Sequence, residues 1–156
     1  CFVIMKKIYS KGILKFDPLP KSGNISKLFK PFWAIVVIDD DVDKYYSWFL
    51  KKRSGLILQA PAWGPHITVF DGEPVPLEKW ETLKQKYDNN IIEFEHEIFI
   101  KSNGKHWWLK SFSPQLDEIR KESGIGNLKW SYHITLGLPI PRQEEYSEYF
   151  FRNQLM

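Results

Sequence analysis

The sequence predicts a single domain of mixed α/β structure in which one unit is repeated. A chain of 156 residues that is 43% hydrophobic is long and apolar enough to bury one core. Segments in which apolar and polar residues alternate, as in strands, are interleaved with segments whose apolar residues recur at helical spacing. The motif Trp-x-x-His-Ile-Thr also occurs twice, at 63–68 and 130–135, once in each half of the chain.

The first half is expected to contain two strands and two helices after an irregular beginning. Prolines and lysines scattered through residues 1–31 favour no regular element there. Gly55 follows an amphipathic stretch and is expected to end its helix. The expected elements are a strand at 33–38, a helix from Asp41 or Asp43 to about Arg53, a strand at 66–70 and a helix from Pro76 to about Tyr87.

The second half is expected to repeat the order of strand and helix. Asn103-Gly104 is a tight-turn signal, which predicts a hairpin. Ser113-Pro114 combines a capping residue with proline at the first helical position. The expected elements are a strand at 92–100, its hairpin partner at 106–110, a helix from Ser113 to about Ser123, a strand at 132–138 and an aromatic amphipathic helix or lid at 142–156.

The repeated motif places two kinds of functional group on one strand face. Side chains alternate along a β-strand, so His66 and Thr68 share a face while Ile67 points to the other one. His133 and Thr135 repeat this arrangement in the second half. If the two halves pack about a two-fold-like axis, two imidazoles and two hydroxyls converge on one cleft.

Two histidines and two threonines suit the cleavage of a phosphodiester. Free imidazole titrates near about pH 6.5, so one histidine can act as a base and the other as an acid at neutral pH. The sequence does not say which is which. The threonine hydroxyls can donate hydrogen bonds to the charged oxygens of the transition state. No cofactor is expected, because such a site needs none.

Two other site chemistries are disfavoured by the sequence. Asp71 lies just beyond the first motif and could join the two histidines around a metal, but the second motif has no matching carboxylate. We therefore expect no metal. A Ser-His-Asp hydrolase is less favoured still, since Gly-x-Ser-x-Gly is absent and a triad does not need two histidines.

Aromatic and basic residues near the motifs are candidates for substrate binding. Lys105, Trp107 and Trp108 follow the hairpin turn on either side of His106 and could hold a base and a phosphate, although ordinary cross-strand packing would also explain them. The candidates for substrate contact are Trp63, Lys105, Trp107, Trp108, Trp130 and Tyr132. Trp33, Trp48 and His96 are expected in the core.

The composition limits which binding partners and which cellular compartment are expected. A net charge of +3 tolerates an anionic ligand but does not predict binding to a long nucleic acid. The single cysteine, Cys1, excludes an intrachain disulfide and suits a reducing compartment. No apolar run approaches the roughly 20 residues of a membrane helix. We expect a soluble, cytosolic protein without a membrane partner, and the sequence does not indicate an oligomeric state.

The doubled His-x-Thr motif resembles that of the 2H phosphoesterase superfamily. This resemblance implies a bilobal, pseudo-two-fold fold of two antiparallel-sheet lobes with outer helices around a central cleft. It also implies chemistry without a metal by His66 and His133, with Thr68 and Thr135 binding phosphate.

Three longer phrases, at 61–67, 103–109 and 133–137, are similar to the anti-CBASS nucleases of T4-type bacteriophages. That similarity implies hydrolysis of the 3′-5′ bonds of cyclic di- and trinucleotide signals in antiphage defence. It also implies a phage protein in the host bacterial cytoplasm. Two alternatives stay open: a 2H phosphodiesterase acting on linear RNA ends or 2′-5′ oligonucleotides, and a non-catalytic cyclic-nucleotide sponge.

Overall fold

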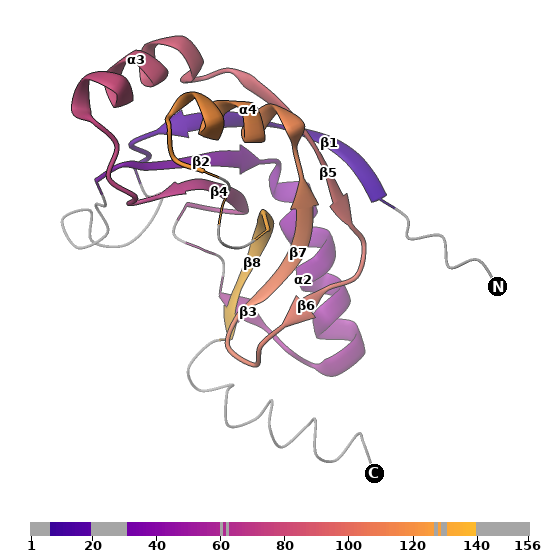
Figure 1. The fold of residues 1–156 in the computed structure, drawn as a ribbon. Helices are drawn as coiled ribbons and strands as arrows, with labels where there is room; N and C mark the ends of the chain where they lie inside the picture. The colour runs from indigo at the N-terminus through magenta and orange to yellow at the C-terminus, as the bar shows by residue number, and fades with distance from the viewer. Residues whose placement is uncertain are drawn as a thin grey trace.

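The computed structural model describes residues 7–19, 31–59, 61, 63–126, 128 and 131–139, and in them the expected mixture of strands and helices is confirmed. In Figure 1, α3 and α4 lie together at one end of the molecule, whereas α2 runs behind β7 and β8. No helix of the described residues is long and apolar enough to span a membrane. The strands are β1 (Lys7–Phe16), β2 (Trp33–Ile38), β3 (Leu58–Gln59), β4 (His66–Asp71), β5 (Ile91–Glu97), β6 (Lys101–Ser102), β7 (Trp107–Phe112) and β8 (His133–Pro139), and the helices are α2 (Asp40–Ser54), α3 (Leu77–Tyr87) and α4 (Pro114–Glu122).

The strands form one sheet that closes on itself. Their order is β3-β8-β4-β2-β1-β5-β7-β6, each pairing is antiparallel, and β8 also pairs with β7. The six strands from β8 round to β7 therefore form an antiparallel barrel, with the short strands β3 and β6 outside the ring. Closure pairs the edges that β7 and β8 would otherwise present to solvent.

One face of the sheet is buried under the helices. Leu14, Ile67 and Ile134 are fully buried on this face and belong to a single core cluster. Trp80 of α3 packs edge-on against Phe16 of β1, α4 contacts β4 and β5, and α2 contacts β8. The histidines of the two motifs belong to the alternate positions, so they lie on the opposite face.

The first strand shows that part of residues 1–31 is regular, contrary to the prediction. β1 pairs with both β2 and β5. Its lysines occupy alternate positions on the exposed face, while Leu14 and Phe16 are buried, so the lysines concealed a strand pattern. Gly12 lies on the buried face, where a Cβ atom would come within 2.5 Å of the Val36 side chain. This close approach excludes any larger residue.

α2 lies where the sequence predicted, but one of its tryptophans is not in the core. The cap is Asp39 rather than either of the two later aspartates, and its carboxylate accepts a hydrogen bond from the N–H of Asp41 at 3.0 Å. Gly55 ends the helix with a φ of 68°. Trp33 is buried as predicted. Trp48 is 55% exposed, because it lies on the solvent side of α2, and its assignment to the core was wrong.

The second half follows the prediction except near the hairpin. α4 starts where expected, as does α3 in the first half, and Ser113 caps α4 through its hydroxyl. The strand predicted at 92–100 stops at Glu97 because the chain bends directly after it. Asn103 forms the expected turn by accepting a hydrogen bond from the N–H of His106 at 2.8 Å. The partner strand begins one residue later than predicted and is two residues longer at its far end.

A buried arginine joins α4 to the rest of the fold. Arg120 donates from Nη1 to the carbonyl of Val69 in β4 at 2.7 Å and from Nη2 to the carbonyl of Gly126 at 2.9 Å. It also forms a two-pronged ion pair with Glu73, at 2.8 and 2.7 Å, and these hydrogen bonds hold the pKa of Glu73 below its ordinary value. The guanidinium carbon lies 5.3 Å from the ring centre of Phe70.

Replacing Arg120 with methionine is expected to lower the free energy of unfolding by about 3–5 kcal/mol, because two carbonyls and a carboxylate lose their common donor. Urea unfolding followed by tryptophan fluorescence measures this. Lys121→Met, at the adjacent exposed position, is the matched control and should stay within about 0.5 kcal/mol of the parent. A loss from Arg120→Met as small as that of the control would contradict the structural role.

Candidate active site

The two copies of the motif lie side by side. β4 and β8 are antiparallel neighbours in which His66 is paired with Thr135. The following pair joins the two isoleucines, and continuing the register by one residue brings Thr68 level with His133. Paired residues on adjacent strands, about 4.8 Å apart, share a face. Each histidine therefore stands opposite the threonine of the other motif, and all four side chains gather on one face.

Both histidines are held by the same kind of hydrogen bond. Nδ1 of His66 donates to the carbonyl of Gly64 at 2.7 Å, and Nδ1 of His133 donates to the carbonyl of Ser131 at 3.3 Å. A carbonyl oxygen only accepts, so Nδ1 carries the proton in each ring. Nε2 of each imidazole is left to exchange a proton with a ligand.

His66 lies in an aromatic corner. The ring centres of Trp33 and Trp63 are each 6.3 Å from its imidazole, and the side chain is only 6% exposed. Burial lowers the pKa of His66, the hydrogen bond to Gly64 opposes this, and a positive charge on His133 lowers the pKa further. His66 is therefore neutral at pH 7, and its Nε2 can accept a proton.

A cleft of about 720 Å³ opens beside the second motif. Its volume is within the range of roughly 300–1,000 Å³ that is typical of small-ligand sites. His66 and Thr68 are not among its lining residues, but His66 is paired with Thr135, which is. The cleft is lined by Asn103, His106, Trp107, Trp108, Ser131, His133 and Thr135.

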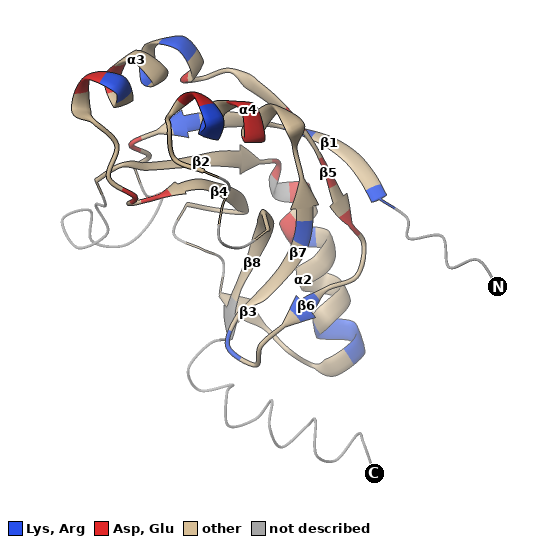
Figure 2. Ribbon diagram, viewed as in Figure 1, with Lys and Arg blue, Asp and Glu red and all other residues tan. Residues whose placement is uncertain are grey.

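β7 supplies an aromatic ring and a cation beside the motifs. Trp108 is paired with Thr135 and Lys110 with His133, and the Trp108 ring centre lies 6.2 Å from the His133 imidazole. Lys110 is the one lysine or arginine on β4, β7 and β8, whose ribbons are otherwise nearly free of charge in Figure 2. Sequence reasoning chose Lys105 and missed Lys110. Lys110 lies two residues after Trp108, and side chains at this spacing share a strand face. This spacing was the signal in the sequence that could have identified Lys110.

Two of the predicted tryptophan contacts differ in their exposure to the cleft. Trp63 packs edge-on against Trp33 and borders His66. Its indole N–H is buried and has no hydrogen-bond partner within the described residues. The Trp63 ring therefore packs beside His66 and encloses the imidazole. Trp107 is mostly buried, yet part of it lines the cleft.

The other predicted contacts do not line the cleft. Tyr132 is buried, and its pKa is raised first by burial and then by a hydrogen bond with Asp117, which anchors the ring in the core. Lys105 is exposed at the hairpin turn, where its N–H donates to Asn103. Trp130 and the proposed lid at 142–156 lie outside the described residues.

The described residues contain no group of three or more His, Cys, Asp or Glu side chains placed to hold a metal ion. No family model, curated protein or solved structure matches the chain. The chemistry of the site is therefore inferred from its own residues and their geometry.

The lowered pKa of His66 predicts a loss of stability in weakly acidic solution. Above the ordinary value of 6.5 the residue is neutral in both the folded and the unfolded chain. Below that value the unfolded chain takes up a proton that the folded chain excludes. The free energy of unfolding should therefore fall as the pH drops from 6.5 through the lower pKa of the folded state.

Chemical unfolding at a series of pH values between about 7.5 and 5 tests this. The parent should lose more stability over the range than His66→Gln, which has no proton to take up. His106→Gln, at an exposed position, is the matched control and should follow the parent. Parallel curves for the parent and His66→Gln would show that the burial of His66 has no effect on its titration.

Proposed function

We propose that the protein is a 2H-type phosphodiesterase that works without a metal ion. One observation carries the proposal: two imidazoles, each with Nδ1 bound to a backbone carbonyl, share a strand face with two threonine hydroxyls. An acid, a base and two hydrogen-bond donors cover every proton transfer and the charge that develops on phosphate. The proposal includes the bilobal organisation of that superfamily, with β4 and β8 as the inner strands of the two lobes.

The different burial of the two histidines supports distinct roles. His66, neutral at pH 7 in its buried corner, removes the proton of a ribose 2′-hydroxyl, and the 2′-oxygen attacks the adjacent phosphorus. His133, which lines the open cleft, donates a proton to the 5′-oxygen as the bond between phosphorus and that oxygen breaks. Thr68 and Thr135 donate hydrogen bonds to the non-bridging oxygens.

This first step leaves a 5′-hydroxyl and a 2′,3′-cyclic phosphate. A water molecule then adds to the cyclic phosphate, with the two histidines exchanging their roles as acid and base. His133 accepts a proton from the water, and His66 returns the proton it took to the departing ribose oxygen. The net reaction adds one water and restores both imidazoles.

The surroundings of the site favour a compact nucleotide. Trp108 offers an aromatic face beside His133, suited to stacking on a base, and Lys110 supplies a positive charge on the same strand face. A long polyanion would need a series of cations, and β4, β7 and β8 carry only Lys110. The choice of cyclic di- or trinucleotide immune signals, and of a phage protein acting in the host cytoplasm, rests on the similarity to the anti-CBASS nucleases.

Incubation with a 3′,5′-linked cyclic dinucleotide in excess EDTA is expected to give a linear product that ends in a 2′,3′-cyclic phosphate or a 3′-phosphate. Chromatography with mass spectrometry detects it. His66→Ala and His133→Ala should each reduce turnover by about 10²–10⁴-fold, because each removes one proton transfer, while binding is largely retained. His106→Ala, which alters the cleft wall but neither motif, is the control and should keep most of the turnover.

The same assay separates the alternatives. Rapid cleavage of the 2′-deoxy analogue would exclude attack by the 2′-hydroxyl. An intact cyclic dinucleotide together with cleavage of linear RNA or of 2′-5′ oligonucleotides would favour a different 2H phosphodiesterase. A ligand that stays intact but binds tightly would favour the sponge, which has no turnover to lose.

Trp108→Ala is expected to weaken substrate binding by about 1–3 kcal/mol, because a base loses its stacking surface. Calorimetry with the inactive His133→Ala background measures binding without cleavage. Trp48→Ala is the matched control, since Trp48 is an exposed tryptophan on α2 outside the cleft. Equal effects of the two substitutions would argue against a base on Trp108.

A further inference from the structure

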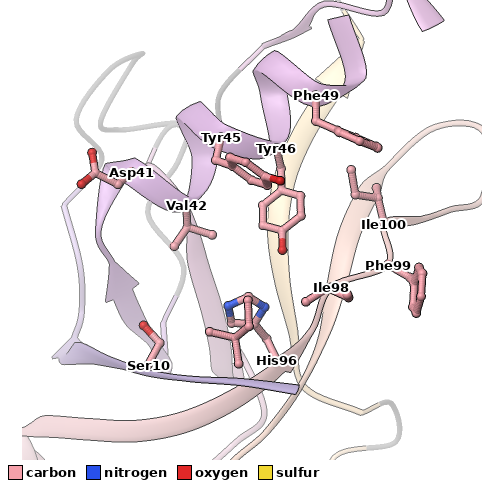
Figure 3. A pocket seen from close by; sticks show the side chains of 11 residues that line it. Ser10, Asp41, Val42, Tyr45, Tyr46, Phe49, His96, Ile98, Phe99 and Ile100 are labelled. Carbon is pink, nitrogen blue, oxygen red and sulfur yellow. The ribbon is translucent and has the colours of Figure 1, made fainter. Parts of the chain in front are cut away.

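A second cavity, of about 610 Å³, lies between α2 and the strands β1 and β5, and shares no lining residue with the cleft beside His133. Figure 3 shows side chains from the helix and from the sheet facing each other across it. Its walls are mainly apolar, with Val42 and Phe49 on the helix side and Ile98 and Ile100 on the other. A volume of this size is typical of a small-molecule site.

Two mostly buried polar side chains, Tyr46 and His96, line this cavity. Tyr46 is 6% exposed and His96 is 3% exposed, and their ring centres lie 6.4 Å apart at 79°. Figure 3 shows the Tyr46 hydroxyl directed from α2 towards the imidazole of His96. Nδ1 of His96 donates to the carbonyl of Glu97 at 2.9 Å, so Nε2 is an acceptor in the neutral ring. No described residue hydrogen-bonds this Nε2 or the Tyr46 hydroxyl.

The polar pair offers a specific pattern to a ligand. Nε2 of His96 requires a donor, and the hydroxyl of Tyr46 can donate to an acceptor beside it. Neither atom is among the described buried polar atoms that lack a partner, so both are open to the cavity and a ligand can reach them. Partly exposed aromatic rings, among them Tyr45 and Phe99, also line the cavity and offer surface to a flat ligand.

The charge around the cavity disfavours anions. No lysine or arginine is among the described residues that line it, whereas the carboxylate of Asp41 stands at its edge. A phosphate group would meet this negative charge with no cation to balance it. The cleft beside His133 differs because no carboxylate is among its described lining residues and Lys110 is paired with His133 on the adjacent strand.

We propose that this cavity binds a neutral, planar heteroaromatic ring, of the class of an unphosphorylated nucleobase or nucleoside. The edge of a nucleobase carries an N–H donor next to a ring-nitrogen or carbonyl acceptor, which is the complement of His96 and Tyr46. The apolar walls cover the two faces of the ring. This site is independent of the phosphodiesterase activity proposed for the cleft.

Calorimetric titration of the whole chain with adenosine is expected to show saturable binding at one site. Tyr46→Phe, which keeps the ring and removes the hydroxyl, should weaken this binding about two- to tenfold, and thermal unfolding verifies that the variant is folded. Phe49→Ser, at a partly exposed wall position, should weaken it as well. Adenosine 5′-monophosphate should bind more weakly than adenosine because of Asp41.

Trp108→Ala distinguishes the two cavities. Adenosine binding should survive this substitution, since Trp108 lines only the cleft. Binding that is lost in Trp108→Ala and unchanged in Tyr46→Phe would place the nucleoside in the cleft and overturn the proposal. The proposal would also be overturned if 1-methylindole, which is flat but lacks both the donor and the acceptor, bound as tightly as adenosine. Absence of adenosine binding up to about 1 mM would overturn it as well.

Discussion

One buried guanidinium joins α4 to β4 and to the loop that leads to β8. Arg120 reaches from α4 to the carbonyl of Val69, the residue after the first His-x-Thr triplet, and to the carbonyl of Gly126, in the loop that leads to β8. A buried charge is costly unless its hydrogen bonds are complete, and Glu73 supplies the remaining acceptors. The requirement for full pairing permits essentially one placement of α4 against β4. The pairing of β4 with β8 then brings the two histidines together.

Much of the fold was predictable wherever local signals agreed with tertiary packing. Gly55 and Ser113 mark helix ends by their own backbone chemistry, so they were found from the sequence alone. β1 was missed because its lysines masked the buried positions between them. The assignment of Trp48 to the core was wrong because the residue type indicates how much apolar surface a side chain has. It does not indicate which side of α2 faces the sheet. Whether a residue is buried depends on a neighbouring element that the local sequence does not specify.

The grouping of the four motif side chains was predictable from the sequence, but Lys110 and the different surroundings of the two histidines were not. Alternation along a strand was enough to place His66 with Thr68, and the repeat implied the second pair. The two copies nonetheless have different surroundings: Trp33 and Trp63 enclose His66, whereas His133 lines an open cleft beside Trp108. Trp33 and Trp108 come from strands distant in sequence, whereas Trp63 lies three residues before His66. The shared Trp-x-x-His-Ile-Thr pattern therefore gives two imidazoles that differ in burial, and burial lowers the pKa of His66.

The position of β8 in the ring has a consequence for biosynthesis. This strand inserts between β4 and β7, both of which precede it along the chain. While the polypeptide is being made, β4 and β7 leave the ribosome as open edges rich in Ile, Val, Phe and Trp, a combination prone to intermolecular pairing. Ring closure and the meeting of His66 with His133 occur in the same late event. A nascent chain without β8 would thus expose both open edges and would lack His133 and Thr135, and the insertion of β8 would change both properties at once.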